Sequence, residues 1–443
     1  MSLPKSNLLS AWLADLPEAT AYCVAYSGGV DSHVLLHLLA NRREILSAPL
    51  SAVHVDHQIQ SQSGDWAVHC RAVCEELQVP FETLHVDGRA RQGESPEAAA
   101  RTARYRALAD WLPTGALLIT AQHQDDQAET LLLQLFRGAG PRGLASMPNL
   151  ASLGHGHLLR PFLDYPQSDI LDYARTHKLR WVEDPTNTDT RYDRNLLRQH
   201  LLPQLREHWP GLTHVLARAA GLQADQAELA TALAELDLAT CGSSELPDRL
   251  RIPDLLSLSP ARQRNLLRHW IELNGFKPPS LEVLKRVGSE VLSAREDATP
   301  LVHWAGAELR RYRQALYLMA PQEKQDPEKR LPWDGNKPLK LAAGTLMAEP
   351  SVGSGLRIEP GASLEVRFRQ GGEVLQPAGR AGHHALKKLF QEWSIPDWER
   401  SHVPLIYQHD ELVAVAGLCV CEGFTAAPDE QGYQLCWKNL GSE

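Results

Sequence analysis

The sequence predicts an α/β protein that begins with a parallel, doubly wound nucleotide-binding sheet. Three observations support this prediction. Short apolar runs alternate with helical segments from residue 21 to residue 136, and strands separated by helices of this size pair in parallel. A stretch rich in Ala, Leu, Glu and Gln follows from about residue 211 and predicts a mostly helical domain. In the last part, apolar and polar residues alternate as they do in β-strands, on either side of one helix, which predicts a small mixed α/β domain.

The elements of the sheet are expected at short intervals. Strands are predicted over residues 21–26, 50–55, 81–86 and 115–121, and helices over 32–40, 65–77, 97–112 and 125–136. In such sheets the ligand binds beyond the carboxyl ends of the strands. We therefore expect the functional site at the loops that follow Tyr26, Val55 and Ala121.

The rest of the chain is expected to form two more domains. Composition divides the 443 residues into domains over 1–215, 216–320 and 335–443. Helical periods such as RAAGLQADQAELATALAEL define the middle domain. The stretch APQEKQDPEKRLPWDGNKP, at 320–338, is rich in proline and charge and predicts a linker before the third.

Charge and cysteine content narrow the functional class. The net charge of −9 excludes a general basic coat for nucleic acid, although a local basic patch is compatible with it. No stretch approaches the roughly 20 apolar residues needed to cross a bilayer, so no membrane partner is expected. The seven cysteines form no disulfide framework, which favours a cytoplasmic protein with reduced thiols. The oligomeric state stays open between monomer and dimer.

The strongest local signal is the loop SGGVDS, which joins the first strand to the first helix. Gly28 and Gly29 let the backbone turn sharply, Ser27 and Ser32 offer hydroxyls, and the helix that follows Val30 and Asp31 offers free N–H groups at its start. These groups predict a cradle for phosphate. Asp31 would repel a bare phosphate and so implies a bridging Mg²⁺. The alternative is a plain strand-to-helix turn, since the P-loop lysine and the GxGxxG fingerprint are both absent.

SGGVDS resembles the loop of the ATP-pyrophosphatase (PP-loop, N-type) superfamily, whose members split ATP into AMP and pyrophosphate. Two further segments resemble the lysidine synthetases within it. VHVDH, at 53–57, is similar to their adenine-side segment, with Asp56 and Gln58 departing from the usual residues. This resemblance implies ATP contacts by His54 and His57. The segment ARTARY is similar to their ARxxRY, which implies that Arg101 binds ATP and that Arg104 stabilises the adenylate phosphate.

A third segment, TAQHQDDQAET at 120–130, places paired carboxylates where a helix begins. Taken alone, such residues can be ordinary helix caps. The segment resembles the TAHHxDDQAET signature of the same family, with Gln122 in place of the first His. The resemblance implies that Asp31 and Asp126 hold Mg²⁺. It also implies that Asp126 and Glu129 bind the ammonium group of lysine, with one of them as the base.

The C-terminal segment 366–391 contains five basic residues and one acidic residue, Glu373. Its net charge of +4 predicts a surface for RNA phosphates, and a merely charged surface is the alternative. LKKLFQEW, at 386–393, overlaps its end and resembles a lysidine synthetase segment. The predicted tRNA-binding residues are Arg367, Arg369, Arg380, Lys387 and Lys388.

The resemblance implies a ligase that joins L-lysine to C2 of the wobble cytidine, position 34, of the isoleucine tRNA with a CAU anticodon. ATP would first adenylate the base, and AMP and pyrophosphate would be released. Two alternatives remain open. A related tRNA thiolase would need a reactive cysteine pair beside the loop, and only Cys23 is near it in sequence. A non-catalytic tRNA-binding protein would have no use for both the loop and the carboxylates.

Overall fold

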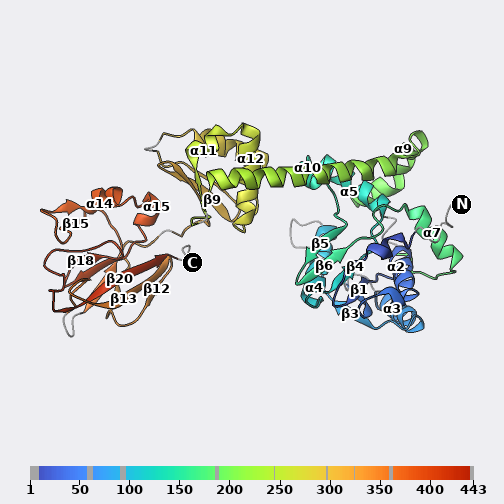
Figure 1. Ribbon diagram of the computed structural model, residues 1–443, viewed down its shortest axis with the longest axis horizontal. Helices are drawn as coiled ribbons and strands as arrows, with labels where there is room; N and C mark the ends of the chain where they lie inside the picture. The colour runs from blue at the N-terminus through green and yellow to red at the C-terminus, as the bar shows by residue number, and fades with distance from the viewer. Residues whose placement is uncertain are drawn as a thin grey trace. The chain divides into compact units, whose positions relative to one another are not determined.

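The computed structural model describes residues 9–56, 63–89, 96–184, 189–243, 245–295, 298–323, 325–358 and 363–439. The chain divides into two compact units, Met1–Ala232 and Leu233–Glu443. The division falls within the long helix α10 (Leu212–Cys241) (Figure 1). Each unit has its own hydrophobic core.

A six-stranded sheet forms the centre of the first unit, with strand order β3-β2-β1-β4-β6-β5. Its strands are β1 (Tyr22–Ala25), β2 (Leu50–Asp56), β3 (Phe81–His85), β4 (Leu117–Ile119), β5 (Leu150–Leu153) and β6 (Gly156–Leu159). All neighbours pair in parallel except β5 and β6, which form an antiparallel hairpin at one edge. The predicted parallel sheet is therefore confirmed, and the hairpin is an addition that the alternation did not indicate.

Helices cover both faces of this sheet, as expected. Val24 faces a core shared by α2 (Val30–Ala40), α3 (Ser63–Glu76) and α7 (Gln167–Thr176). Its neighbour Cys23 faces the opposite core, where Leu108 of α4 (Pro96–Trp111) packs. Successive strand residues point to opposite faces. Near-continuous apolar strands such as Tyr22–Ala25 are consequently buried on both sides.

Shorter helices complete the first unit around α5 (Gln124–Phe136), which follows β4. They are the 3₁₀ turns η1 (Ala11–Asp15) and η2 (Arg43–Ile45), and the helices α6 (Pro141–Leu144), α8 (Asp193–Leu196) and α9 (Leu202–His208). A π-helical turn, Leu197–Leu201, joins α8 to α9. Pro203 has no N–H to donate to the carbonyl four residues earlier, which is a physical reason for the wider turn at this place.

The second unit begins with the end of α10 and contains α11 (Ile252–Ser257), α12 (Pro260–Leu273), α13 (Leu281–Arg286) and a π-helical turn (Val287–Leu292). These helices share a core with a sheet of order β7-β10-β9-β8. Its strands are β7 (Arg249–Arg251), β8 (Leu301–Trp304), β9 (Ala307–Tyr312) and β10 (Ala315–Met319). This middle region thus carries strands in addition to the helices that its sequence periods predict.

The C-terminal part is strand-rich with two short helices, α14 (Leu386–Glu392) and α15 (Asp397–Arg400), in agreement with the predicted mixed α/β domain. One sheet has the order β11-β14-β17-β18-β19, a second the order β12-β13-β20, and β15 pairs with β16. The strands are β11 (Leu331–Trp333), β12 (Leu339–Leu341), β13 (Gly344–Val352), β14 (Leu364–Arg367), β15 (Val374–Leu375), β16 (His384–Ala385), β17 (Leu405–Gln408), β18 (Glu411–Val415), β19 (Cys419–Val420) and β20 (Gln431–Asn439).

Two global features bear on function. In the described part of the chain, every helix is too short or too polar to traverse a lipid bilayer. All seven cysteines are free, and five of them are buried.

Candidate active site

The loop Ser27–Ser32 follows β1 and turns directly into α2, at the carboxyl edge of the sheet. Gly28 has a φ of +87°, which favours glycine, and a Cβ at this position would lie 3.1 Å from Cys70 Sγ. The two hydroxyls shape the loop from within. Ser32 Oγ accepts a hydrogen bond from Ser27 N at 3.2 Å, and Ser27 Oγ accepts one from Gly29 N at 3.3 Å. The first N–H groups of α2 have no partner within the helix and remain available for an anion.

Asp31 lies in the first turn of α2 and points toward the start of α5. Its Oδ2 is 3.7 Å from His123 Nε2. Its Oδ1 is buried and has no hydrogen-bond partner in the described part of the chain. Burial raises the pKa of Asp31 above its usual value, although His123 acts in the opposite direction. A carboxylate in this state is stabilised when a cation binds to it.

His123 connects Asp31 to the acidic start of α5. The ring is buried, with Nε2 3.5 Å from Asp126 Oδ2 and Nδ1 3.7 Å from Asp125 Oδ2. Its backbone N–H donates to Asp126 Oδ2 at 3.1 Å, within a capping box. The capping role that the sequence allowed is therefore present, and the same carboxylate also faces the phosphate loop.

Asp126 and Glu129 lie on one face of α5 and share a single guanidinium group. Arg198, in the π-helical turn, donates from Nε to Glu129 Oε1 at 2.7 Å and from its terminal nitrogen to Asp126 Oδ1 at 2.8 Å and Glu129 Oε2 at 2.9 Å. Arg194 adds longer contacts of 3.9 Å to both carboxylates and donates to Thr130 Oγ1 at 3.0 Å. An acidic pair is thus held by an arginine pair from α8 and the turn after it.

The two carboxylates respond differently to these surroundings. Burial opposes ionisation of Asp126, but His123, Arg198 and Arg194 together outweigh it and lower its pKa. Glu129 is only 1% exposed, and burial raises its pKa despite the hydrogen bonds from Arg198. Asp126 is therefore the stronger anion of the pair, and Glu129 is the better candidate for accepting a proton.

Asp125 has a different role from its neighbour Asp126. Its Oδ2 accepts the backbone N–H of Gln167 at 2.9 Å, and its Oδ1 is paired with Arg206 of α9. Arg206 also donates to Thr213 Oγ1 at 2.9 Å. Asp125 accordingly links the start of α5 to α7, α9 and α10, and positions the helix that carries Asp126 and Glu129.

The donor set fits a magnesium ion. Mg²⁺ prefers carboxylate and phosphate oxygens. The buried Oδ1 of Asp31 lacks a partner, and the Oδ2 atoms of Asp31 and Asp126 both approach His123 Nε2. Within the described residues, protein side chains form no cluster of three or more metal-binding groups.

The other predicted nucleotide residues lie in α4 and near the end of β2. Arg101 and Arg104 lie in the middle of α4 and stack on Tyr105, with guanidinium carbons 5.0 and 5.8 Å from the ring centre. His54, near the end of β2, is buried, and its Nδ1 lies 2.9 Å from the carbonyl oxygen of Tyr26. Burial lowers its pKa, which favours the neutral form of the ring. The predicted contact residue His57 lies outside the described residues.

The basic residues of the C-terminal segment fall into two groups. The three arginines are ion-paired, and the pairs are Arg367 with Glu365 and Asp410, Arg369 with Glu373 at 3.9 Å, and Arg380 with Glu392 at 2.7 Å. Lys387 and Lys388 are exposed on α14 and make no ion pair with any described residue. These two lysines are the strongest candidates for RNA phosphates.

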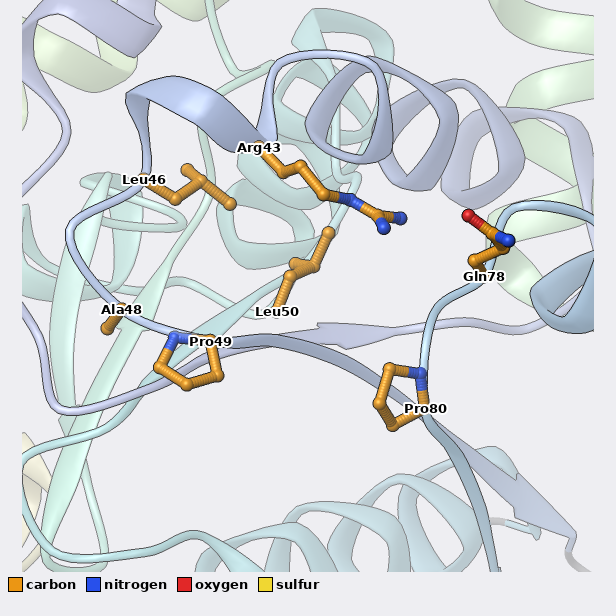
Figure 2. A pocket seen from close by; sticks show the side chains of 7 residues that line it. All are labelled: Arg43, Leu46, Ala48, Pro49, Leu50, Gln78 and Pro80. Atoms are coloured by element: carbon orange, nitrogen blue, oxygen red, sulfur yellow. The ribbon is translucent and has the colours of Figure 1, made fainter.

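Sequence reasoning missed three contributors to the site: His123, Arg198 and Arg206. A signal for Arg198 existed, because RNLLR places Arg194 and Arg198 four apart on one helix face, which complements carboxylates three apart. A surface pocket elsewhere is lined by Arg43, Leu46, Ala48, Pro49, Leu50, Gln78 and Pro80 (Figure 2). It lies at the amino ends of β2 and β3, at the opposite edge of the sheet from the phosphate loop.

Three segments of the chain match known protein families. Residues 5–205 match a family described as a PP-loop domain. Residues 250–317 match the TilS substrate binding domain, and residues 364–437 match the TilS substrate C-terminal domain. Among solved structures, the U34-tRNA thiolase NcsA from Methanococcus maripaludis with its 4Fe-4S cluster is similar at a TM-score of 0.42 and 17% identity, over 49% of this chain and 76% of that chain.

Curated relatives match over almost the entire sequence. The tRNA(Ile)-lysidine synthase of Coxiella burnetii is 42% identical over 430 residues, which cover 96% of this chain and 95% of the relative. The tRNA(Ile)-lysidine synthase of Methylococcus capsulatus is 43% identical over 433 residues, which cover 97% of this chain and 99% of the relative. Given this identity and coverage, and the match of all three family segments, the chain belongs to the tRNA(Ile)-lysidine synthase family.

Proposed function

We propose that the chain ligates L-lysine to C2 of the wobble cytidine, position 34, of the isoleucine tRNA with a CAU anticodon. ATP is consumed, and AMP and pyrophosphate are released. The observation that carries this proposal is the approach of Asp31 in the phosphate loop to the carboxylates of α5, through His123. An ATP site at the loop and a site for a cationic amine at α5 would thereby be neighbours. The substrates suit a cytoplasmic location.

The first step joins the base to AMP. The C2 oxygen of cytidine attacks the α-phosphorus of ATP, and the bond from that phosphorus to the pyrophosphate oxygen breaks. The N–H groups at the start of α2 would stabilise the charge that develops on the phosphates. Arg101 would bind ATP and Arg104 would stabilise the adenylate phosphate, which is supported by their common position on α4, where both guanidinium groups stack on Tyr105.

We infer that Asp31 and Asp126 hold Mg²⁺. When bound there, the ion would offset the negative charge of the departing pyrophosphate. The unpartnered Asp31 Oδ1 supports this role for Asp31. The lowered pKa of Asp126 supports its presence as an anion.

The second step replaces AMP with lysine. The ε-amine attacks C2, and the bond between C2 and the adenylate oxygen breaks. Fewer than about one lysine amine in a thousand is neutral at pH 7, so a proton must leave the ammonium group first. Asp126 and Glu129 would bind that group, and the raised pKa of Glu129 suits it to accept the proton. Arg198 now makes hydrogen bonds to both carboxylates, so lysine must share them with Arg198 or displace it.

A thiolase activity is disfavoured by the cysteines near the loop. Cys23 and Cys70 are both buried. Burial raises the pKa of Cys70 to about 12, and it also raises that of Cys23. Thiols in this state are poor nucleophiles at neutral pH.

One assay tests the proposal: the full chain is incubated with the tRNA transcript, ATP, Mg²⁺ and labelled lysine, and label in tRNA, AMP and pyrophosphate are measured. Lysine-dependent labelling with one AMP per label is the expected result. AMP release that does not depend on lysine would indicate a different nucleophile. Absence of AMP would overturn catalysis and leave the non-catalytic alternative.

A further inference from the structure

The end of α5 exposes an aromatic side chain close to the catalytic face. Phe136 is 67% exposed and its neighbour Leu135 is 54% exposed, whereas Phe162 in the same unit is fully buried. Exposing a large aromatic ring forgoes the stabilisation that its burial would provide. Single exposed apolar side chains are common on proteins, so the position of Phe136 on α5 and its basic surroundings decide whether it marks a binding surface.

Phe136 is aligned with Glu129 on α5. The two residues are seven positions apart, and with 3.6 residues per turn they lie only about 20° apart around the helix axis. The rise of 1.5 Å per residue places them about 10 Å apart along that axis. The exposed ring is therefore on the same side of α5 as the carboxylate that faces the reaction, two turns farther along.

The surface next to Phe136 is open and basic. Arg137 is exposed and makes no ion pair with any residue that the structure describes, and Arg142 is exposed nearby in α6. Gly138 has a φ of +69°, and a Cβ on Gly138 or Gly140 would meet nothing within 4 Å. An open turn with the guanidinium group of Arg137 next to an aromatic residue suits single-stranded nucleic acid, since bases stack on the ring and phosphates pair with arginine.

We propose that Phe136 and Arg137 form a platform on which an anticodon-loop base near the target cytidine stacks. This inference rests on the proposed function, because it needs the cytidine to reach Glu129. A base that enters an active site leaves the stack, while its neighbours remain outside. Stacked bases are spaced about 3.4 Å apart, so about 10 Å corresponds to roughly three nucleotides. The platform is therefore within reach of the nucleotides that flank the target.

Binding of a hairpin RNA that carries the anticodon loop tests the platform without requiring turnover. We expect Phe136→Ala in the full chain to weaken binding about tenfold, as removal of one base stack typically does. Phe136→Tyr should bind like the wild type because it keeps the ring. Val68→Ala is the matched control, because Val68 is 68% exposed on α3. Equal affinities for Phe136→Ala and Phe136→Tyr would overturn the proposal.

A cycle with the RNA identifies the stacked base. Abasic nucleotides are placed one at a time at the positions within three nucleotides of the target. At one of these positions the abasic RNA should bind the wild type about tenfold more weakly, and the same change should weaken binding to Phe136→Ala very little. Fully additive losses at every position would contradict stacking on Phe136. These experiments measure affinity and do not require turnover. If the wild type binds the hairpin with this pattern but makes no lysidine, the proposed function is refuted and the platform is still supported.

Discussion

Arg198 balances the charge of the acidic face of α5. It pairs with both Asp126 and Glu129, and Glu129 is almost completely buried. Removing one partner from such a network leaves buried charge without compensation. We expect Arg198→Ala to lower the free energy of unfolding by about 2 kcal/mol, toward the lower end of the usual range because the guanidinium group is 35% exposed.

Calorimetric unfolding measures this effect, and two variants serve as comparisons. Arg198→Lys should recover only part of the loss, because an ammonium group cannot match the bidentate geometry of guanidinium. Arg194→Ala should cost less, since its contacts to the same carboxylates are 3.9 Å long. An Arg198→Ala protein with wild-type stability would show that the ion pairs contribute nothing to the fold.

Asp31 is expected to be indispensable for adenylation. We predict that Asp31→Ala abolishes tRNA-dependent release of pyrophosphate, because the carboxylate closest to the phosphate loop and its unpartnered Oδ1 are lost. Asp65→Ala is a matched control, since Asp65 is also an acidic residue in the first turn of a helix but is exposed on α3. Pyrophosphate release at the wild-type rate in Asp31→Ala would remove Asp31 from the phosphate site.

At the scale of elements, the sequence predicted those helices and strands whose signals lie within one short stretch of residues. The helix expected over 125–136 is α5 at Gln124–Phe136, because its acidic start and apolar spacing are both local signals. The hydrogen bonds from Arg198 to Asp126 and Glu129 could not be predicted in this way. They join residues 69 and 72 positions apart, and the meeting of these residues depends on how α8 and the π-helical turn pack against α5. The strands of the middle region were missed because helical periods dominate the sequence around them.

The packing of α2 on α7 predicts a pH-dependent stability. His37 Nδ1 lies 3.0 Å from the hydroxyl of Tyr173, and the His177 ring is 5.1 Å away. Burial, with His177 and His33 nearby, lowers the pKa of His37 to about 4. Because the unfolded chain binds this proton near pH 6.5, the contribution to stability is complete above pH 6.5 and is lost progressively as the pH falls toward 4.

We expect this loss to reach about 1–2 kcal/mol, after allowing for the partly exposed ring. Melting temperatures of the wild type and His37→Gln, measured from pH 7 to pH 4, test it. The wild type should lose stability more steeply than His37→Gln over that interval. Parallel curves would mean that His37 titrates normally in the folded chain.

At the scale of the whole molecule, the net charge of −9 conceals an uneven distribution. The count of +4 over residues 366–391 overstates the unpaired positive charge of that segment, because acidic partners lie outside that window. Glu365 and Asp410 pair with Arg367, and Glu392 pairs with Arg380. A count along the sequence cannot detect partners that strand pairing or a helix brings close. The division into three domains over 1–215, 216–320 and 335–443 likewise stays a prediction, as does the oligomeric state.

The last prediction concerns Lys387 and Lys388, which make no ion pair with any residue that the structure describes. Reversing both charges, as Lys387→Glu with Lys388→Glu, should raise the KM for tRNA and leave the KM for ATP unchanged, because α14 belongs to the second unit and the phosphate loop to the first. The dependence of log KM on log salt should also become shallower by about one for each lost phosphate contact. Lys337→Glu with Lys340→Glu is the matched control, since these exposed lysines near β12 produce the same change in net charge. If both double variants alter the KM for tRNA equally, the effect is one of overall charge. Only a larger effect at α14 would identify Lys387 and Lys388 as a docking surface for tRNA.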